Sequence, residues 1–447
     1  MIGWTSHRVA GVTSDDSNAS RAGVSACDPS HGPLPSKQDS QRTRFLQNTY
    51  ASPTHEPAAG GRSAGRAPNA EAGLETDVVV LDDPSLLSEY VDQWEDLAAE
   101  AIEPNVFYEP WMLLPAIENF AKEKTLRFVL IFVKPSPSGD ERILSGFFPL
   151  ERRGRYRGLP VPVSGLWRHV HCFLSLPLIR REWPKESLRA FINWSQSAFG
   201  ESGILEFPWV PTDGPFRTAL REVLDEVHTP SMSVEEFSRG FADATGDFEL
   251  YLNNAISGKG QREIRRKERR LGAAELVEYR QLKETDSLGP WIEEFLTLEA
   301  SGWKGRQSTA MGCSEDERRF FVSTLEQGFR LGKLLMTSVR VAGAPIAIQC
   351  SMLSGEGAFA FKTAYDERYA RCSPGVLLQI ETIRQIHNSS RVAWLDSCAA
   401  PNSFAVNRVC TGRRNLDTVL AATGGVAGRL LVSTLPVLRG IKRKLSN

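Results

Sequence analysis

The sequence predicts an α/β protein with two tandem mixed α/β domains, each with a central, mainly antiparallel sheet flanked by helices. Segments with the helical spacing of apolar residues alternate with hairpin-linked runs of period two, which is typical of a mixed α/β layer. The predicted hairpin at residues 126–150 also resembles the one at residues 334–352, and similar helices flank both. We therefore interpret the chain as two copies of one α/β unit.

Length and composition agree with this organisation. A chain of 447 residues is long enough for two or three domains, and its 41% hydrophobic and 24% charged residues are typical of globular proteins. The net charge of −1 does not indicate a nucleic-acid partner, and we expect no DNA binding.

The cysteine pattern and the hydropathy of the chain indicate whether it binds a metal and in which cellular compartment it lies. The seven cysteines are scattered without a C-x-x-C pair, which argues against a metal site and predicts reduced thiols. No apolar run reaches the ~20 residues of a membrane span, and the first residues lack the apolar core of a signal peptide. We expect a cytoplasmic protein with no transmembrane segment.

The N-terminal segment has a different composition. Residues 1–75 are rich in Ser, Ala, Gly, Pro and Arg and contain three aromatic residues. Such a stretch buries too little apolar surface to offset the entropy lost on ordering, so we predict that it is disordered.

The first predicted domain covers residues 76–240. Its expected elements are a strand at 77–83, a helix at 84–101, a helix that follows the turn FYEPW and reaches 120, the hairpin at 126–150, a helix at 186–199, a strand at 204–210, a helix at 216–227 and a strand at 229–237.

The second predicted domain covers residues 241–425. Its expected elements are a helix at 247–253, a basic segment at 259–271, a strand at 275–282, helices at 285–301 and from 315, the hairpin at 334–352, a strand at 359–365, a helix at 374–386, a strand at 392–396 and a closing segment at 409–416. Ser314 and Glu317 have the spacing of a capping box. A basic tail at 426–447 follows; we interpret it as loosely packed, with a surface-seeking amphipathic helix as the alternative.

The segment at residues 359–378 joins a strand to a helix through a polar loop. Ser373 occupies the expected N-cap, Pro374 the first helical position, and Gly375 follows. The free amides and the dipole of such a helix start favour an anion, so this segment predicts an anion cradle. The alternative is an ordinary strand–loop–helix connection.

Glu299 is the most informative single residue. It lies on the apolar face of its predicted helix, where a carboxylate needs a partner or its pKa rises. The chain then breaks at Gly302 and presents Trp303 and Lys304, which suggests a substrate pocket. The alternative is that Glu299 lies near the helix end and simply pairs with Lys304.

Further polar residues fall within or at the ends of predicted strands. Lys362 lies inside the strand at 359–365, Tyr365 and Asp366 end it, and Asp396 ends the strand at 392–396. Strand ends of open α/β sheets are where ligands tend to bind, so these four residues are candidates for a cleft.

Two other groups are weaker candidates. Cys398 follows Asp396, but no Cys–His–Asn pattern supports a covalent nucleophile. His169 and His171 alternate on a predicted strand, and without a third ligand we interpret them as structural.

Four blocks of the second half resemble a known family. LEASGWKGRQSTA, GAPIAIQ, AFKTAYDERYARCSPGVLL and LDSCAAPNSFAVNR are similar to the CelD-like branch of the GNAT acyltransferases, a branch associated with cellulose biosynthesis and related to the Fem-type aminoacyl transferases. The resemblance is strongest over residues 245–416. It extends more weakly to residues 77–237, where FYEPW and SGFFPL fit a first, degenerate GNAT repeat.

The resemblance implies a sheet in which two neighbouring strands splay apart to admit acyl-CoA. The donor pyrophosphate would lie on Arg371, Cys372, Ser373 and Gly375. The usual Q/R-x-x-G-x-G/A loop is replaced by R-C-S-P-G, and Fem-type relatives use aminoacyl-tRNA instead, which the basic segment at 259–271 would suit.

The resemblance also implies direct attack of an amine on a thioester. Glu299 is the candidate base or amine-orienting group, and Trp303 and Lys304 are candidates for binding the acceptor. The remaining candidates for the catalytic cleft are Lys362, Tyr365 and Asp366, with Asp396 as a supporting partner.

The function expected on this basis is N-acyl transfer, with acetyl-CoA or another acyl-CoA as donor and an amine of a sugar or small metabolite as acceptor, linked to exopolysaccharide, cellulose or envelope biosynthesis. Two alternatives stay open. One is a Fem-like transferase that uses aminoacyl-tRNA. The other is a catalytically silent GNAT pair that acts as a scaffold among polysaccharide-synthesis proteins.

Overall fold

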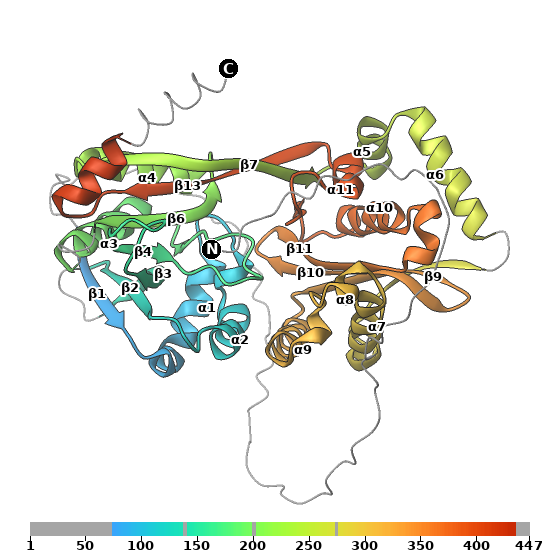
Figure 1. The fold of residues 1–447 in the computed structure, drawn as a ribbon, viewed down its shortest axis with the longest axis horizontal. Coiled ribbons are helices and arrows are strands. Elements are labelled where there is room, and N and C mark those ends of the chain that lie inside the picture. The colour runs from blue at the N-terminus through green and yellow to red at the C-terminus, as the bar shows by residue number, and fades with distance from the viewer. Residues whose placement is uncertain (1–73, 137–140, 199–202, 273–275, 435–447) are drawn as a thin grey trace, which may run out of the picture. The chain divides into compact units, whose positions relative to one another are not determined.

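The computed structural model describes residues 74–136, 141–198, 203–272 and 276–434 (Figure 1). The prediction of disorder for residues 1–75 falls outside these ranges except at residues 74 and 75. Most of the predicted basic tail, from residue 435 onward, also lies outside them.

The first half of the described chain contains seven strands and four α-helices. These are β1 (Glu75–Leu81), α1 (Val91–Ala99), α2 (Pro110–Phe120), β2 (Leu126–Lys134), β3 (Ile143–Arg153), β4 (Val163–Leu166), β5 (Leu178–Ile179), α3 (Pro184–Ala198), β6 (Ile204–Pro211), α4 (Pro215–Glu226) and β7 (Ser231–Asp243), with 3-10 helices η1 (Pro84–Tyr90) and η2 (Val106–Tyr108). The helix predicted at 84–101 is therefore a 3-10 helix followed by α1.

The second half continues with six strands and seven α-helices in the described residues. These are α5 (Phe248–Ala255), α6 (Gly258–Leu271), β8 (Val277–Gln281), α7 (Leu288–Ser301), α8 (Trp303–Arg306), α9 (Glu315–Arg330), β9 (Leu334–Val341), β10 (Ala344–Ser354), β11 (Gly357–Tyr365), α10 (Pro374–His387), β12 (Trp394–Asp396), α11 (Phe404–Val409) and β13 (Gly412–Ala421), with 3-10 helices η3 (Met311–Cys313) and η4 (Glu367–Cys372).

These strands form one large mixed sheet. The strand order is β1-β2-β3-β4-β6-β13-β7-β12-β11-β10-β9-β8, with β5 beside β3. Among the described strands, β4 pairs with β6 and β11 with β12 in parallel, and the other pairs are antiparallel. The predicted mixed α/β fold with mainly antiparallel strands is confirmed.

The two halves share this sheet through β13, the last strand. It pairs with β7 from Gly412 opposite Phe241 to Ala421 opposite Ser231, and its other edge pairs with β6. The boundary predicted between residues 240 and 241 falls inside β7. The division into two domains remains a prediction, and the sheet is continuous across it.

Helices cover both faces of the second-half strands. Figure 1 shows α10 on one face of β9–β11, with α7, α8 and α9 on the other. On the α7 and α9 side, Phe295, Phe320 and Phe359 belong to an aromatic core that continues into the first half. Full burial of each such side chain contributes on the order of 1.5–3 kcal/mol. The polar groups described below therefore lie within a well-packed interior.

A β-bulge in β11 decides which way its polar residue points. Cys350 of β10 lies opposite Lys362, but the next residue, Ser351, lies opposite Ala360, so Phe361 is an extra residue without a partner. Strict alternation would have put Phe361 and Lys362 on opposite faces. The bulge instead places Lys362 on the face of Cys350, the side covered by α7 and α9.

Candidate active site

The parallel strands β11 and β12 separate after a short contact. They pair over three positions, from Gly357 opposite Trp394 to Phe359 opposite Asp396. β11 then continues to Tyr365 without a described partner on that edge. The C-terminal half of β11 therefore has an edge without a paired strand, a position at which a ligand can lie beside a strand.

Lys362 projects from this part of β11 toward two groups from other elements. Its Nζ lies 2.9 Å from Nδ1 of His171, which belongs to the first half. Nε2 of His171 in turn lies 3.3 Å from Oε1 of Glu317 at the start of α9. The three side chains form a polar chain that links both halves.

The electrostatics of this chain follow from its burial. Desolvation, assisted by the cation of Lys304, lowers the pKa of Lys362 to about 8, although Glu299 and Glu317 oppose the shift. Burial and the nearby lysines hold the pKa of His171 well below its usual value, so this imidazole is neutral. Burial also raises the pKa of Glu317. The pKa of Lys362 thus lies closer to physiological pH than that of an ordinary lysine.

Aromatic rings surround the same groups. The ring of His171 stacks on Phe320 at 5.6 Å between centroids and meets Phe361 edge-on. The Nζ of Lys362 lies 5.4 Å from the ring centroid of Phe361 and 5.8 Å from that of Phe173. These rings exclude water from the ammonium group, which is the physical cause of its lowered pKa.

Glu299 lies on the buried face of α7, as predicted. Its Oε1 accepts a hydrogen bond from Lys304 Nζ at 2.7 Å, and its Oε2 accepts one from the amide of Met311 at 2.8 Å. Lys304 also donates to the carbonyl oxygen of Thr363 on β11 at 3.2 Å. Both carboxylate oxygens are therefore engaged in holding the 302–311 segment against β11.

A small cavity of about 30 Å³ opens beside this pair. The structure brings Glu299, Trp303, Lys304 and Tyr365 together around it, along with Thr363. Trp303 and Tyr365 are exposed, so the cavity faces outward. Four predicted residues from two segments, 299–304 and the end of β11, thus line one cavity.

Asp366 lies at the end of β11 and begins η4. Its carboxylate accepts hydrogen bonds from the backbone amide and guanidinium of Arg368, which lower its pKa. The next residue, Glu367, accepts a hydrogen bond from the amide of Trp303 at 2.8 Å. These contacts fasten the end of β11 to α8.

The predicted anion cradle is open at the start of α10. The helix begins at Pro374, and Ser373 occupies the N-cap, both as predicted, but Ser373 adopts the left-handed conformation with φ 55° and its side chain makes no capping bond. Instead its Oγ accepts a hydrogen bond from Lys267 Nζ of α6 at 2.9 Å. A Cβ added to Gly375 would meet only Ala405, at 3.9 Å. Pro374 has no N–H, and the amides of Val376 and Leu377 donate to the carbonyl oxygen of Ser373 at 3.0 and 3.3 Å. The groups placed to contact a phosphate here are therefore the amide of Gly375 and the ammonium of Lys267.

The other two predicted cradle residues precede it in η4. Arg371 is exposed and Cys372 is half-buried.

Asp396 lies apart from these groups and is fully buried. Its carboxylate accepts hydrogen bonds from Arg239 at 2.6 Å, from Arg414 at 3.0 Å and from the amide of Cys398 at 3.0 Å. Burial alone would raise its pKa, but the two arginines hold that pKa below its usual value. Asp396 joins β12 to β7 and β13. Burial raises the pKa of the Cys398 thiol, so it is not an activated nucleophile.

Sequence reasoning missed three residues of this region. His171 was interpreted as structural on a predicted strand, but β4 ends at Leu166 and His171 lies in a turn. Glu317 had been explained as a helix-capping residue, and Lys267 as one charge in a basic run. His171 and Glu317 meet near Lys362, whereas Lys267 reaches Ser373. Both placements depend on tertiary contacts, for which the sequence carries no local signal.

Comparison with known proteins shows where the chain has relatives. Residues 258–404 match the model of the family described as acetyltransferase (GNAT) domain. This segment is similar to GNAT acetyltransferases. It contains α6, the cradle, Lys362 and Glu299. A search of curated proteins found no match.

Solved structures with a similar fold include FemX, with 9% identity and a TM-score of 0.49 over 74% of this chain and 95% of that chain. The C-terminal domain of a putative lysylphosphatidylglycerol synthetase from Agrobacterium fabrum has 14% identity and a TM-score of 0.44 over 78% and 97%. A tandem GNAT protein from the clavulanic acid biosynthesis pathway has 14% identity and a TM-score of 0.40 over 78% and 99%.

Two further observations concern the described residues only. No helix among them is long and apolar enough to span a bilayer. Nor do three or more of their His, Cys, Asp and Glu side chains gather in a way that could bind a metal ion.

Proposed function

We propose that the protein is an N-acyltransferase that moves an acyl group, in the first place acetyl, from acyl-CoA to an amine of a sugar or small metabolite. One observation carries this proposal. Lys362, with a pKa of about 8, lies where β11 has separated from β12, on the strand that leads into the cradle at the start of α10. All of these elements fall within the segment that matches the GNAT domain.

The donor would bind along the free edge of β11. Its pyrophosphate would contact the amide of Gly375 and the ammonium of Lys267, and its thioester would lie near the bulge. A backbone amide at this bulge, where the register shifts around Phe361, would donate to the oxyanion that forms during transfer.

Neutral Lys362 would take a proton from the acceptor ammonium. The free amine then attacks the thioester carbonyl carbon; the C–N bond forms, the C–S bond breaks and the thiolate leaves with the electron pair. The proton that the attacking nitrogen loses passes to this thiolate, so the products are the amide and the CoA thiol. His171 and Glu317 orient Lys362. Because both oxygens of Glu299 are already engaged, its proposed role is to position Lys304 and the 302–311 segment around the acceptor.

The remaining predicted residues have supporting roles in this proposal. Trp303 and Tyr365 border the acceptor cavity, Asp366 fixes the end of β11, and Asp396 holds β12. The resemblance to the CelD-like branch supports an acceptor from exopolysaccharide, cellulose or envelope biosynthesis and a cytoplasmic location, with polysaccharide-synthesis proteins as partners.

A second candidate is a Fem-like transferase that uses aminoacyl-tRNA. One observation favours it: α6 carries seven basic residues, and one of them, Lys267, reaches the cradle. Several of its arginines are exposed, as a phosphate-binding surface requires. The third reading is a catalytically silent scaffold.

Calorimetry separates these readings. The wild type should bind acetyl-CoA saturably, and Gly375→Trp, which fills the cradle, should abolish that binding. Gly154→Trp is the matched control, because a Cβ at that exposed position, which lies far from the cradle in the sequence, meets no atom within 4 Å. Binding of aminoacyl-tRNA in place of acetyl-CoA would select the Fem-like reading. Binding of neither donor would refute both transferase readings and leave the scaffold.

A further inference from the structure

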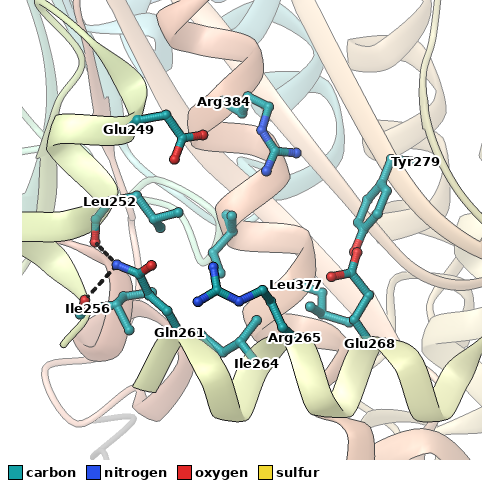
Figure 2. A pocket seen from close by; sticks show the side chains of 11 residues that line it. Glu249, Leu252, Ile256, Gln261, Ile264, Arg265, Glu268, Tyr279, Leu377 and Arg384 are labelled. Atoms are coloured by element: carbon teal, nitrogen blue, oxygen red, sulfur yellow. Dashed lines mark hydrogen bonds between the residues drawn. The ribbon is translucent and has the colours of Figure 1, made fainter. Parts of the chain in front are cut away.

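A second cavity, of about 240 Å³, lies between α5, α6, β8 and α10 (Figure 2). Its apolar wall consists of Leu252, Ile256, Ile264, Leu377 and Ile380. Four of these five side chains are largely buried, and Leu252 is half-buried. The wall is therefore a firm apolar surface that already belongs to the packed core.

The rim of this cavity is polar and charged. Figure 2 shows the guanidinium of Arg265 pointing into the pocket, with Glu249 and Arg384 across from it. On one side Glu268 accepts a hydrogen bond from the hydroxyl of Tyr279 at 2.5 Å. Gln261 closes the other side by donating to the carbonyl oxygen of Ile256 at 3.0 Å, as the dashed lines in Figure 2 indicate.

The cavity adjoins the cradle because the same two helices form both. Lys267, which contacts Ser373, lies on α6 between the rim residues Arg265 and Glu268. On α10, Leu377 follows Pro374 by less than one turn. A ligand with a phosphate in the cradle can therefore extend directly into the cavity.

The size of the cavity indicates what fraction of a ligand it holds. Pockets that bind whole small molecules have volumes of roughly 300–1,000 Å³. A volume of about 240 Å³ suits one part of a larger molecule whose remainder lies elsewhere. The remainder of such a molecule would include a phosphate group bound in the cradle.

We propose that this cavity binds the adenine base of the donor, while the 5′-phosphate of the attached ribose, the first phosphate of the CoA pyrophosphate, lies in the cradle. The inference rests on the proposed function. Adenine is flat, with apolar faces and a polar edge: one face would pack on the wall at Leu377, and the planar guanidinium of Arg265 would stack on the other. The carboxylate of Glu249 at the rim would accept a hydrogen bond from the exocyclic amino group.

Two donors carry this group, because CoA contains an adenosine and the acceptor end of tRNA terminates in one. The direct test titrates the full chain with adenosine 3′,5′-bisphosphate, which lacks the pantetheine arm. We expect saturable binding that Arg265→Glu weakens at least tenfold. Arg266→Glu is the matched control, since Arg266 is an exposed arginine of the same helix that does not line the cavity.

Equal weakening by both variants would mean that only the general charge of α6 matters, and would overturn the inference. So would the absence of bisphosphate binding in a wild type that binds acetyl-CoA. That result would leave the proposed function intact. Circular dichroism of both variants shows that the helix is retained.

Further titrations identify the source of the adenosine. If Arg265→Glu weakens acetyl-CoA but leaves acetyl-pantetheine unchanged, the base belongs to CoA. If it weakens only an aminoacylated RNA hairpin ending in CCA, and acetyl-CoA does not bind, the cavity assignment holds while the acyl-CoA donor fails. If wild type binds acetyl-CoA and acetyl-pantetheine equally well, adenosine contributes nothing and the inference is wrong.

Discussion

The two halves contain the same connection between parallel strands, used in different ways. In the first half β4 leads through a loop and α3 to β6, and in the second β11 leads through η4 and α10 to β12. Each strand pair is three positions long, and each helix begins with a proline, Pro184 or Pro374. The difference lies in the loop before the helix.

The first-half loop, residues 167–183, folds into the interior. Phe173 packs on Phe361 of β11, Leu174 and Leu176 are fully buried, and His171 reaches Lys362. The corresponding second-half loop leaves the start of α10 open. The first-half loop is thus packed into the interior and contacts the candidate site of the second half. This agrees with the proposal that the first repeat is degenerate.

The third position of each parallel pair carries an acid, which allows a direct comparison of stability. Asp396 is enclosed by two largely buried arginines, whereas Glu206 pairs with Arg153, whose side chain is 42% exposed. Asp396→Ala leaves buried guanidiniums unpaired and should lower the free energy of unfolding by about 3–5 kcal/mol. Glu206→Ala should cost about 1 kcal/mol or less. Urea unfolding measures both, and similar losses would refute the comparison.

Lys362 gives the next largest effect. Removing the proposed proton acceptor by Lys362→Met should lower kcat by about 10²–10³-fold. The affinity for acetyl-CoA, measured by calorimetry, should stay within about twofold, since the cradle is untouched. Lys185→Met, at the exposed start of α3 in the first-half connection, is the control and should leave both quantities unchanged. An active Lys362→Met enzyme would remove Lys362 from the mechanism.

The sequence was sufficient for features that depend on local pattern. The hairpins, the start of α10 and the buried face of Glu299 follow from periodicity and capping preferences, and the structure confirms them. Boundaries were less accurate: α7 begins at Leu288 rather than residue 285, and β7 extends to Asp243.

The remaining features depend on contacts between distant segments. A one-residue bulge turns Lys362 toward His171, which lies 191 positions away in the chain. Strict period-two alternation cannot indicate such a bulge. The position of β13 between β6 and β7 likewise depends on how distant strands pair. The composition of the chain and the spacing of its apolar residues do not predict this strand order.

The pH dependence tests how the first-half loop supports the second-half site. Below pH 8 Lys362 is protonated and cannot accept the proton of the acceptor, so kcat should rise as pH increases through about 8. Neutral His171 accepts a hydrogen bond from the ammonium form and so stabilises it. His171→Phe should therefore move the profile to lower pH, by roughly half to one pH unit.

The control for this profile is His387→Phe, because His387 contacts Gly246 in the second half and not the cluster around Lys362. If the pH profile of kcat is unchanged in His171→Phe, His171 contributes only to packing and does not affect the pKa of Lys362. A rate that falls through pH 8 in the wild type would show that Lys362 acts as a cation instead.

The smallest effect concerns Lys267, for which we find no counterpart among the contacts of α3. Lys267→Ala should weaken acetyl-CoA binding about fivefold, on the order of 1 kcal/mol, because one charge-assisted contact to phosphate is lost while the amide of Gly375 and the helix dipole remain. The difference from wild type should shrink as salt is raised from 50 to about 300 mM, since screening weakens this contact. Lys185→Ala, near the start of α3, should have no effect at either salt concentration. Equal affinities of wild type and Lys267→Ala would mean that Lys267 only fastens α6 to the loop before α10, and the amide of Gly375 and the helix dipole would then have to hold the donor.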